Sequence, residues 1–165
     1  MANLLDSPVI LATRRNHGLE HATIHILSRH FPGKPLAGHS NPGGFFILGD
    51  VPTESVRESV TEALARLRNG ESRLAVHPGC GTNYVVAGAL AGTLAWLGMT
   101  GAKSSRQRLD RFPLVILLSA IGFMASQPLA PVIQQRITTS GDLGNLAIVD
   151  VYPVRRGVHR IITRG

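Results

Sequence analysis

Two long stretches without charged residues dominate the pattern of hydrophobic and polar positions along this chain. The first runs from Asn83 to Ala102, and the second extends from Phe112 towards Arg136. Each reaches the roughly 20 residues that a helix needs to cross the hydrocarbon core of a bilayer. The alternative is a buried helical hairpin in a water-soluble protein, but the remaining residues are too few to cover two such helices. The pattern therefore predicts two transmembrane helices joined by the loop 103–111.

The residues before this hairpin predict a small α/β domain. A helix is expected from Ser7-Pro8 to the glycine- and proline-rich loop 31–44, since proline is favoured at the first helical position. The apolar spacing over 53–68 predicts a second, amphipathic helix, with one face buried. Short apolar runs at 45–48 and 73–76 predict strands. His30 and His39 fall at or in the loop and are interpreted as surface residues.

The residues after the hairpin predict additional strands. Apolar and polar positions alternate over 146–163 and are interrupted by a turn near 155–157, as in a β-hairpin. We expect this hairpin to pack on the N-terminal domain and to complete its sheet. The predicted fold class is α+β, with a domain over 1–82, a transmembrane hairpin over 83–133 and C-terminal strands over 134–165.

Residues 16–25, which read N-H-G-L-E-H-A-T-I-H, carry the densest chemistry in the chain. His17, Glu20 and His21 form an H-x-x-E-H motif, and His25 lies one helical turn further on. Helical positions four apart differ by only about 40° around the axis, so the three histidines share a face with Glu20 beside it. Two such imidazoles can bind one divalent ion, and a neighbouring carboxylate can act as base for a water on that ion. The inverted zinc-protease motif uses this arrangement.

The alternative for this motif is that the histidines are partly buried polar residues without a ligand. Glu20 argues for the metal, because a structural glutamate in a helix usually pairs with a basic residue three or four positions away. Those positions hold Asn16, His17, Thr23 and Ile24, and none of them is lysine or arginine.

A second motif, H-P-G-C-G-T-N, begins at His77. Its proline and glycine favour a tight turn, which lets His77 and Cys80 point into the same space. Imidazole and thiolate are both good zinc ligands, and Cys80 is the only cysteine, which excludes an internal disulfide. The turn could instead only cap the helix that follows. Taken with the first motif, it predicts one zinc or other divalent metal site built from His17, His21, His77 and Cys80, with His25 a further candidate.

The two motifs together resemble the YqhQ-type bacterial membrane proteins, described as predicted metal-dependent enzymes. The resemblance covers residue 16 to the first membrane helix and rests on H-G-x-E-H followed by H-P-x-C-G-T. The matching residues are His17, Gly18, Glu20, His21, His77, Pro78, Cys80, Gly81 and Thr82. It implies a membrane-associated metal site built from both motifs. This chain is shorter, has fewer expected spans and has Ala22 where a lysine usually follows, as in a smaller sister family.

The net charge of +7 comes mostly from arginine. A basic protein of this kind is a candidate for binding nucleic acid. The basic residues are dispersed, aromatic residues make up only 5% of the chain, and no basic helix is present, so we expect no nucleic-acid partner. The C-terminal arginines Arg155, Arg156, Arg160 and Arg164 are suited to anionic lipid head groups, and the bilayer is the expected partner.

The expected location is the bacterial inner membrane, with two spans. Basic residues in loop 103–111 place that loop in the cytoplasm by the positive-inside rule, but arginines also flank the other side of the hairpin. Asp6 and a short, broken apolar run exclude a signal peptide, which favours cytoplasmic termini. A Gly88/Gly92 pair in the first span predicts close packing, either with the second span or with a second copy of the chain.

These residues are compatible with two main classes of function. The first has an unknown peptide or small-molecule substrate, and the second has no substrate. In the first, the protein is a membrane-associated zinc-dependent hydrolase of a peptidase-like kind, with Glu20 as its catalytic base and an open coordination position for water. In the second, all four ligands bind at once, and the protein is a metal-stapled membrane adaptor or interaction protein without catalysis. A metal or redox sensor that uses Cys80 is a third and less favoured alternative.

Overall fold

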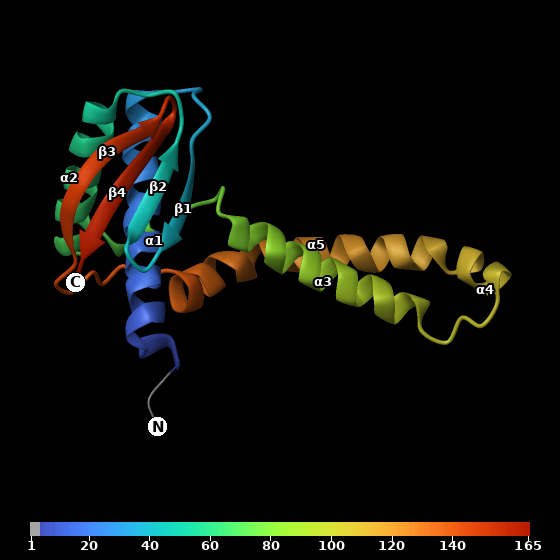
Figure 1. The fold of residues 1–165 in the computed structure, drawn as a ribbon. Helices are drawn as coiled ribbons and strands as arrows, with labels where there is room; N and C mark the ends of the chain where they lie inside the picture. The colour runs from blue at the N-terminus through green and yellow to red at the C-terminus, as the bar shows by residue number, and fades with distance from the viewer. Residues whose placement is uncertain (1–3) are drawn as a thin grey trace. The chain divides into compact units, whose positions relative to one another are not determined.

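The computed structural model describes residues 4–165, which form two units (Figure 1). The first unit combines the chain up to His77 with Gln135–Gly165, and the second unit is Pro78–Gln134. The first contains a four-stranded antiparallel sheet and two long helices, and the second is helical. The fold is therefore of the mixed α+β class, as the sequence predicts.

The sheet of the first unit has the strand order β1-β2-β4-β3, and every neighbouring pair is antiparallel. Its strands are β1 (Ala37–Asn41), β2 (Gly44–Leu48), β3 (Ala147–Arg155) and β4 (Val158–Arg164). The C-terminal hairpin β3–β4 completes the sheet because β4 pairs with β2, with Phe46 opposite Arg160. Gly44 permits this pairing: its φ is +130°, and a Cβ there would lie 2.1 Å from the carbonyl oxygen of Ile161.

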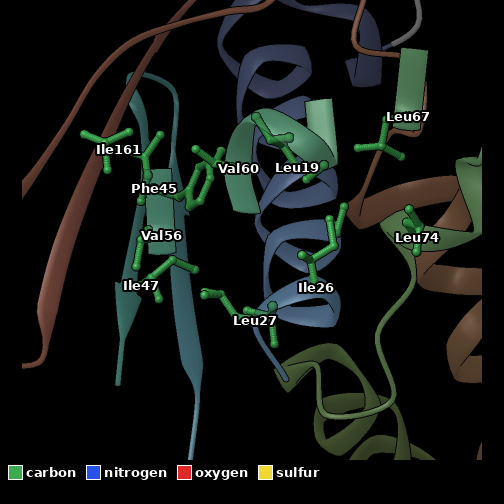
Figure 2. Close-up of a cluster of buried hydrophobic side chains, with 14 of the residues drawn as sticks. Leu19, Ile26, Leu27, Phe45, Ile47, Val56, Val60, Leu67, Leu74 and Ile161 are labelled. Atoms are coloured by element: carbon green, nitrogen blue, oxygen red, sulfur yellow. The ribbon is translucent and has the colours of Figure 1, made fainter. Parts of the chain in front are cut away.

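Helices α1 (Pro8–His30) and α2 (Thr53–Arg68) cover one face of this sheet (Figure 1). The core lies between the two layers, where Leu19 of α1 and Val60 of α2 face Phe45 and Ile161 of the sheet (Figure 2). All four side chains are fully buried. Burial of each stabilises the fold by about 1.5–3 kcal/mol, so these contacts fix the face that α1 turns towards the sheet.

Two local predictions for the first unit are wrong. Strand β1 lies inside the segment predicted as loop, so His39 is a strand residue, and the predicted strand 73–76 is instead the 3-10 turn η2 (Ser72–Ala75). The sequence of β1, A-G-H-S-N, has low β propensity, and its strand conformation depends on pairing with β2. In η2, Leu74 and Ala75 are buried among the core residues rather than paired in the sheet.

The second unit contains helix α3 (Gly81–Met99), the short helix α4 (Ser105–Asp110) and helix α5 (Phe112–Ile133). A π-helical turn, Gln134–Thr138, continues α5. Helices α3 and α5 pack closely where glycines remove side chains: a Cβ at Gly122 would lie 2.8 Å from backbone atoms of Ala91. A Cβ at Gly88 or Gly92 would meet nothing within 4 Å. The Gly88/Gly92 face is therefore not the contact between the two helices.

The prediction of two membrane spans is not supported. Among residues 4–165, only Phe112–Thr138 is long and apolar enough to cross a membrane, and 11% of its most apolar window is buried within the structure. Helix α3 contains polar and small residues, including Asn83 and four glycines, which lower its hydropathy relative to a membrane span. The structure thus has a helical hairpin with one candidate span, and a multi-pass topology is not supported.

Candidate metal centre

Four histidines of the first unit lie together along one side of α1. His17, His21 and His25 come from successive turns of the helix, and His77 follows η2. The ring centroids are 4.3 Å apart for His17 and His21, 5.7 Å for His21 and His77, and 4.7 Å for His25 and His77. The structure therefore brings the histidines of both sequence motifs into one cluster.

Backbone carbonyls fix the tautomers of the first two histidines. Nδ1 of His17 lies 2.9 Å from the carbonyl oxygen of Thr138, and Nδ1 of His21 lies 2.8 Å from that of Ala75. A carbonyl can only accept, so each Nδ1 carries a proton and donates it. Metal-binding histidines are usually held in this way through their other nitrogen. The ligand atoms of His17 and His21 lie within 4.8 Å of each other.

His25 is held in the opposite sense. Its Nε2 lies 2.8 Å from the carbonyl oxygen of Val76, so Nε2–H is the donor and Nδ1 keeps the lone pair. The three helix histidines thus share a face, as the spacing predicts, but they do not present the same nitrogen. Ala75 and Val76 supply two adjacent carbonyls because η2 and the residue after it run alongside α1 rather than joining the sheet.

His77 is the half-buried member of the cluster that comes from outside α1. Its burial, followed by its proximity to His25 and His21, lowers its pKa from 6.5 to about 4. Burial disfavours the charged imidazolium, and a neighbouring imidazolium would repel it further. At neutral pH His77 is therefore an uncharged ring, which is the form that can bind a metal.

The carboxylate of Glu20 lies against strand β1. Its side chain is buried, and its Oε2 accepts a 2.5 Å hydrogen bond from Oγ of Ser40. Gly38 leaves the space that this carboxylate occupies, because a Cβ there would lie 2.3 Å from Oε1. Glu20 lies about 60° from His17 around the helix axis, so its carboxylate borders the histidine face without being part of it.

The segment after the π-helical turn closes against the same stretch of α1. The amide of Ser140 donates to the carbonyl of Arg14 at 2.9 Å, and the Arg14 guanidinium donates to the carbonyl of Thr139 at 3.2 Å. Gly18 permits the close approach, since a Cβ there would lie 2.1 Å from the carbonyl oxygen of Ser140. This packing holds Thr138 beside His17.

Cys80 belongs to the second unit, as the residue before helix α3, and its side chain is buried. It follows His77 by three residues, so the covalent chain alone keeps its Cα within roughly 11 Å of that of His77.

The supporting residues were not predicted from the sequence. Thr138, Ala75 and Val76 contribute backbone carbonyls, which leave no side-chain signature. Ser40 and Gly38 lie in the segment predicted as loop, and A-G-H-S-N carries no local strand signal, because its strand conformation comes from pairing with β2.

Comparison with known proteins gives a family without an assigned activity. A family model described as a domain of unknown function, DUF6391, matches residues 12–151 and so includes both histidine motifs. An uncharacterised protein of Picosynechococcus sp. (strain ATCC 27264 / PCC 7002 / PR-6) is 34% identical over 161 residues, which cover 86% of this chain and 72% of the relative. No solved structure matches the chain.

Proposed function

Because the chain belongs to DUF6391, a family of unknown function, we propose its activity from the site alone: a membrane-associated, zinc-dependent hydrolase, peptidase-like in its use of an H-x-x-E-H helix. The observation that carries this proposal is the pair of Nδ1–H bonds from His17 and His21 to backbone carbonyls. These bonds fix the orientation of two neighbouring rings through Nδ1, which is how metal-binding histidines are usually held.

We propose His17 and His21 as two protein ligands of this ion, with Cys80 as the third ligand that the sequence motif predicts. Three protein ligands leave one position of a tetrahedral zinc for water, which is the arrangement of catalytic rather than structural sites. Bound zinc would lower the pKa of that water and polarise a substrate carbonyl.

Glu20 is the proposed general base. Glu20 borders the histidine face. Its carboxylate accepts a hydrogen bond from Ser40 and occupies the space that a side chain at position 38 would fill. A carboxylate has about four acceptor positions, so a hydrogen bond from Ser40 does not by itself prevent Glu20 from accepting a proton from water. A base positioned in this way contributes a factor of about 10²–10⁴ to the rate.

The candidate span Phe112–Thr138 supports a membrane association for this enzyme. The last residue of this span, Thr138, belongs to the first unit and supplies the carbonyl that holds Nδ1 of His17. The bacterial inner membrane is the location we propose.

The second candidate is a metal-stapled membrane adaptor without catalysis. The bond between Ser40 and Glu20 favours it, because a buried carboxylate that joins α1 to β1 has a structural role whether or not it is a base. In that case His77 would complete a closed set of four ligands, and no position would remain for water.

Substitution of Glu20 separates the two candidates. Detergent-purified protein loaded with zinc would be assayed with fluorescently labelled casein and with a p-nitrophenyl ester, before and after chelation and zinc restoration. The hydrolase proposal predicts chelator-sensitive turnover that falls at least 100-fold in Glu20→Gln with zinc content unchanged. Glu58→Gln, an exposed glutamate of α2, is the matched control. Turnover that survives in Glu20→Gln would contradict the assignment of the base.

A further inference from the structure

The face of the sheet opposite α1 and α2, which we call the outer face, carries one row of side chains across all four strands (Figure 1). Directly opposed residues on neighbouring strands share a face of the sheet. The register aligns these residues, in strand order: His39, Phe46, Arg160 and Tyr152. Their sequence neighbours, such as Phe45, are buried among the core residues on the helix side. The outer face therefore has a line of ring and guanidinium side chains at its centre.

Arg160 is fixed in the middle of this row. Its guanidinium lies over the ring of Phe46, 4.5 Å from the centroid, where the electron-rich ring face attracts a cation. Its Nη2 donates to Oδ1 of Asn41 and to the carbonyl oxygen of Gly43, each over 3.1 Å. These contacts occupy Arg160 within the protein and make the centre of the outer face a preformed surface.

Two other arginines stand at the two ends of the same face. Arg155 is opposite Val158 beside the β3–β4 turn, and Arg164 is opposite Ala147 at the far end of the hairpin. Both arginines are exposed, and within residues 4–165 neither forms an ion pair. Strand β4 rises about 3.4 Å per residue from Val158 to Arg164, so the two side chains are anchored roughly 20 Å apart. One small anion cannot reach both of them, but an extended anionic surface can.

Exposed apolar side chains accompany these charges. Leu48 is opposite Val158 and so lies on the outer face, beside the Arg155 end of the hairpin. Tyr152 of the central row is also exposed, as is Val154, which lies at a bulge of β3. Apolar side chains that stand beside arginines and a tyrosine are typical of surfaces that settle at the headgroup boundary of a bilayer.

We infer that the outer face docks on the anionic headgroups of a bilayer. Residues 147–164 contain four arginines and one aspartate, so the hairpin is complementary to a negative surface. The candidate span Phe112–Thr138 ends within the first unit, so the chain itself keeps this unit near a bilayer that the span crosses. The inference rests on the proposed membrane association, adds the lipid class that is recognised, and does not depend on the metal.

Nucleic acid is the other anionic surface that aromatic and arginine side chains on a sheet can bind. Such binding relies on bases that stack on open aromatic faces. The guanidinium of Arg160 already lies over the ring of Phe46. The outer face therefore favours lipid headgroups, and nucleic acid is an alternative that the experiment tests.

Quenching of a fluorophore by spin-labelled lipid tests the docking. Full-length His39→Cys protein is labelled with bimane and reconstituted into vesicles of phosphatidylcholine, with or without phosphatidylglycerol, that contain a lipid spin-labelled near its headgroup. Position 39 reports on the central row and leaves the arginines and apolar residues intact. Glu58→Cys carries the same label on an exposed position of α2, on the other side of the sheet, where we expect no quenching. The wild type, whose only cysteine, Cys80, is buried, gives the labelling background.

We expect the label at position 39 to be quenched in vesicles that contain phosphatidylglycerol and much less in phosphatidylcholine alone. Arg155→Gln combined with Arg164→Gln should abolish the phosphatidylglycerol-dependent quenching, because both exposed charges are lost. Arg29→Gln combined with Arg73→Gln removes the same charge from exposed positions outside the sheet and should leave the quenching unchanged. Far-ultraviolet circular dichroism checks that each variant is folded.

Flotation of the vesicles separates this inference from the proposed membrane association. Protein that floats with the vesicles but shows no quenching at position 39 would overturn the docking and leave the membrane association intact. Quenching that is equal in both lipid mixtures, or that survives the loss of Arg155 and Arg164, would overturn the recognition of anionic headgroups. Binding of a single-stranded oligonucleotide that requires these arginines, without quenching by lipid, would assign the face to nucleic acid instead. Protein that floats with neither vesicle would contradict the membrane association and, with it, this inference.

Discussion

His21 donates its Nδ1–H to the carbonyl oxygen of Ala75, 54 positions later in the chain, over 2.8 Å. Both groups are buried, so the bond is made away from water and an unpaired partner would be costly. The bond holds η2 along helix α1, and it leaves Nε2 of His21 with its lone pair. The same contact thus stabilises the fold and orients the ring of His21, a proposed metal ligand.

Substitution of Gly38 by alanine is expected to displace the carboxylate of Glu20. A Cβ there would lie 2.3 Å from Oε1, and neither the buried carboxylate nor the paired strand can move without losing contacts. We expect a loss of about 1–3 kcal/mol in the free energy of unfolding, measured by urea denaturation, together with lower hydrolase activity. Gly43→Ala is the control, since its nearest neighbour would be 3.6 Å away. Equal stability of the two variants would show that Glu20 is not confined at this position.

Acidification of the metal-free protein is expected to destabilise it through His77. Its pKa is about 4 in the folded state and 6.5 in the absence of the fold. Between these values the unfolded chain binds a proton that the folded chain does not, so stability rises with pH and is lost as pH falls from 6.5 to about 4. Urea unfolding at pH 7.5 and 4.5 should show a smaller difference for His77→Gln than for the wild type. His30→Gln should behave as the wild type, and an unchanged difference in His77→Gln would exclude this role for His77.

Substitution of Gly122 by alanine is expected to separate helices α3 and α5. The added Cβ would lie 2.8 Å from backbone atoms of Ala91, which cannot rotate away as a side chain can. Gly92→Ala, also in this hairpin, meets nothing within 4 Å and serves as the control. Thermal denaturation in detergent should show a lower Tm only for Gly122→Ala. A lower Tm for Gly92→Ala instead would indicate that the Gly88/Gly92 face binds a second copy of the chain.

An arginine in the middle of α5 should weaken membrane association. Leu117 is 57% exposed and lies within the candidate span, where arginine costs about 2.5–3.5 kcal/mol near the centre of the bilayer. Leu117→Arg is therefore expected to move protein from the membrane fraction into the alkaline carbonate wash. Leu109→Arg makes the same change at a 73% exposed position in α4, outside the span, and should leave the distribution unaltered. Complete extraction of the wild type would contradict the membrane assignment.

The sequence predicts those parts of the fold that depend on local periodicity. The apolar spacing of α2 and the uncharged run of α5 give helix bounds that match the structure, Thr53–Arg68 and Phe112–Ile133. Strand β1 could not be predicted, because A-G-H-S-N becomes a strand only through pairing with β2 and contact with α1. In β3, bulges near Val149 and Val154 break the alternation that the sequence predicts, since each inserts an unpaired residue.

The site divides in the same way. Spacing of four along α1 predicts that His17, His21 and His25 share a face, which the contacts with His77 and the backbone carbonyls confirm. The nitrogen that each ring presents could not be predicted, because it depends on carbonyls brought in by η2 and by the segment after α5. The role of Glu20 as a base and the participation of Cys80 remain predictions.

The zinc content of the full-length protein in detergent, measured by inductively coupled plasma mass spectrometry, tests the central claim most directly. The comparison is between wild type, His21→Asn and the exposed control His30→Asn. Asparagine at position 21 can still donate to the Ala75 carbonyl but has no counterpart of Nε2. We predict bound zinc in the wild type and in His30→Asn, and loss of the tightly bound ion in His21→Asn with the fold retained. Zinc-free wild type after loading, or equal zinc in His21→Asn, would contradict a metal centre at this helix.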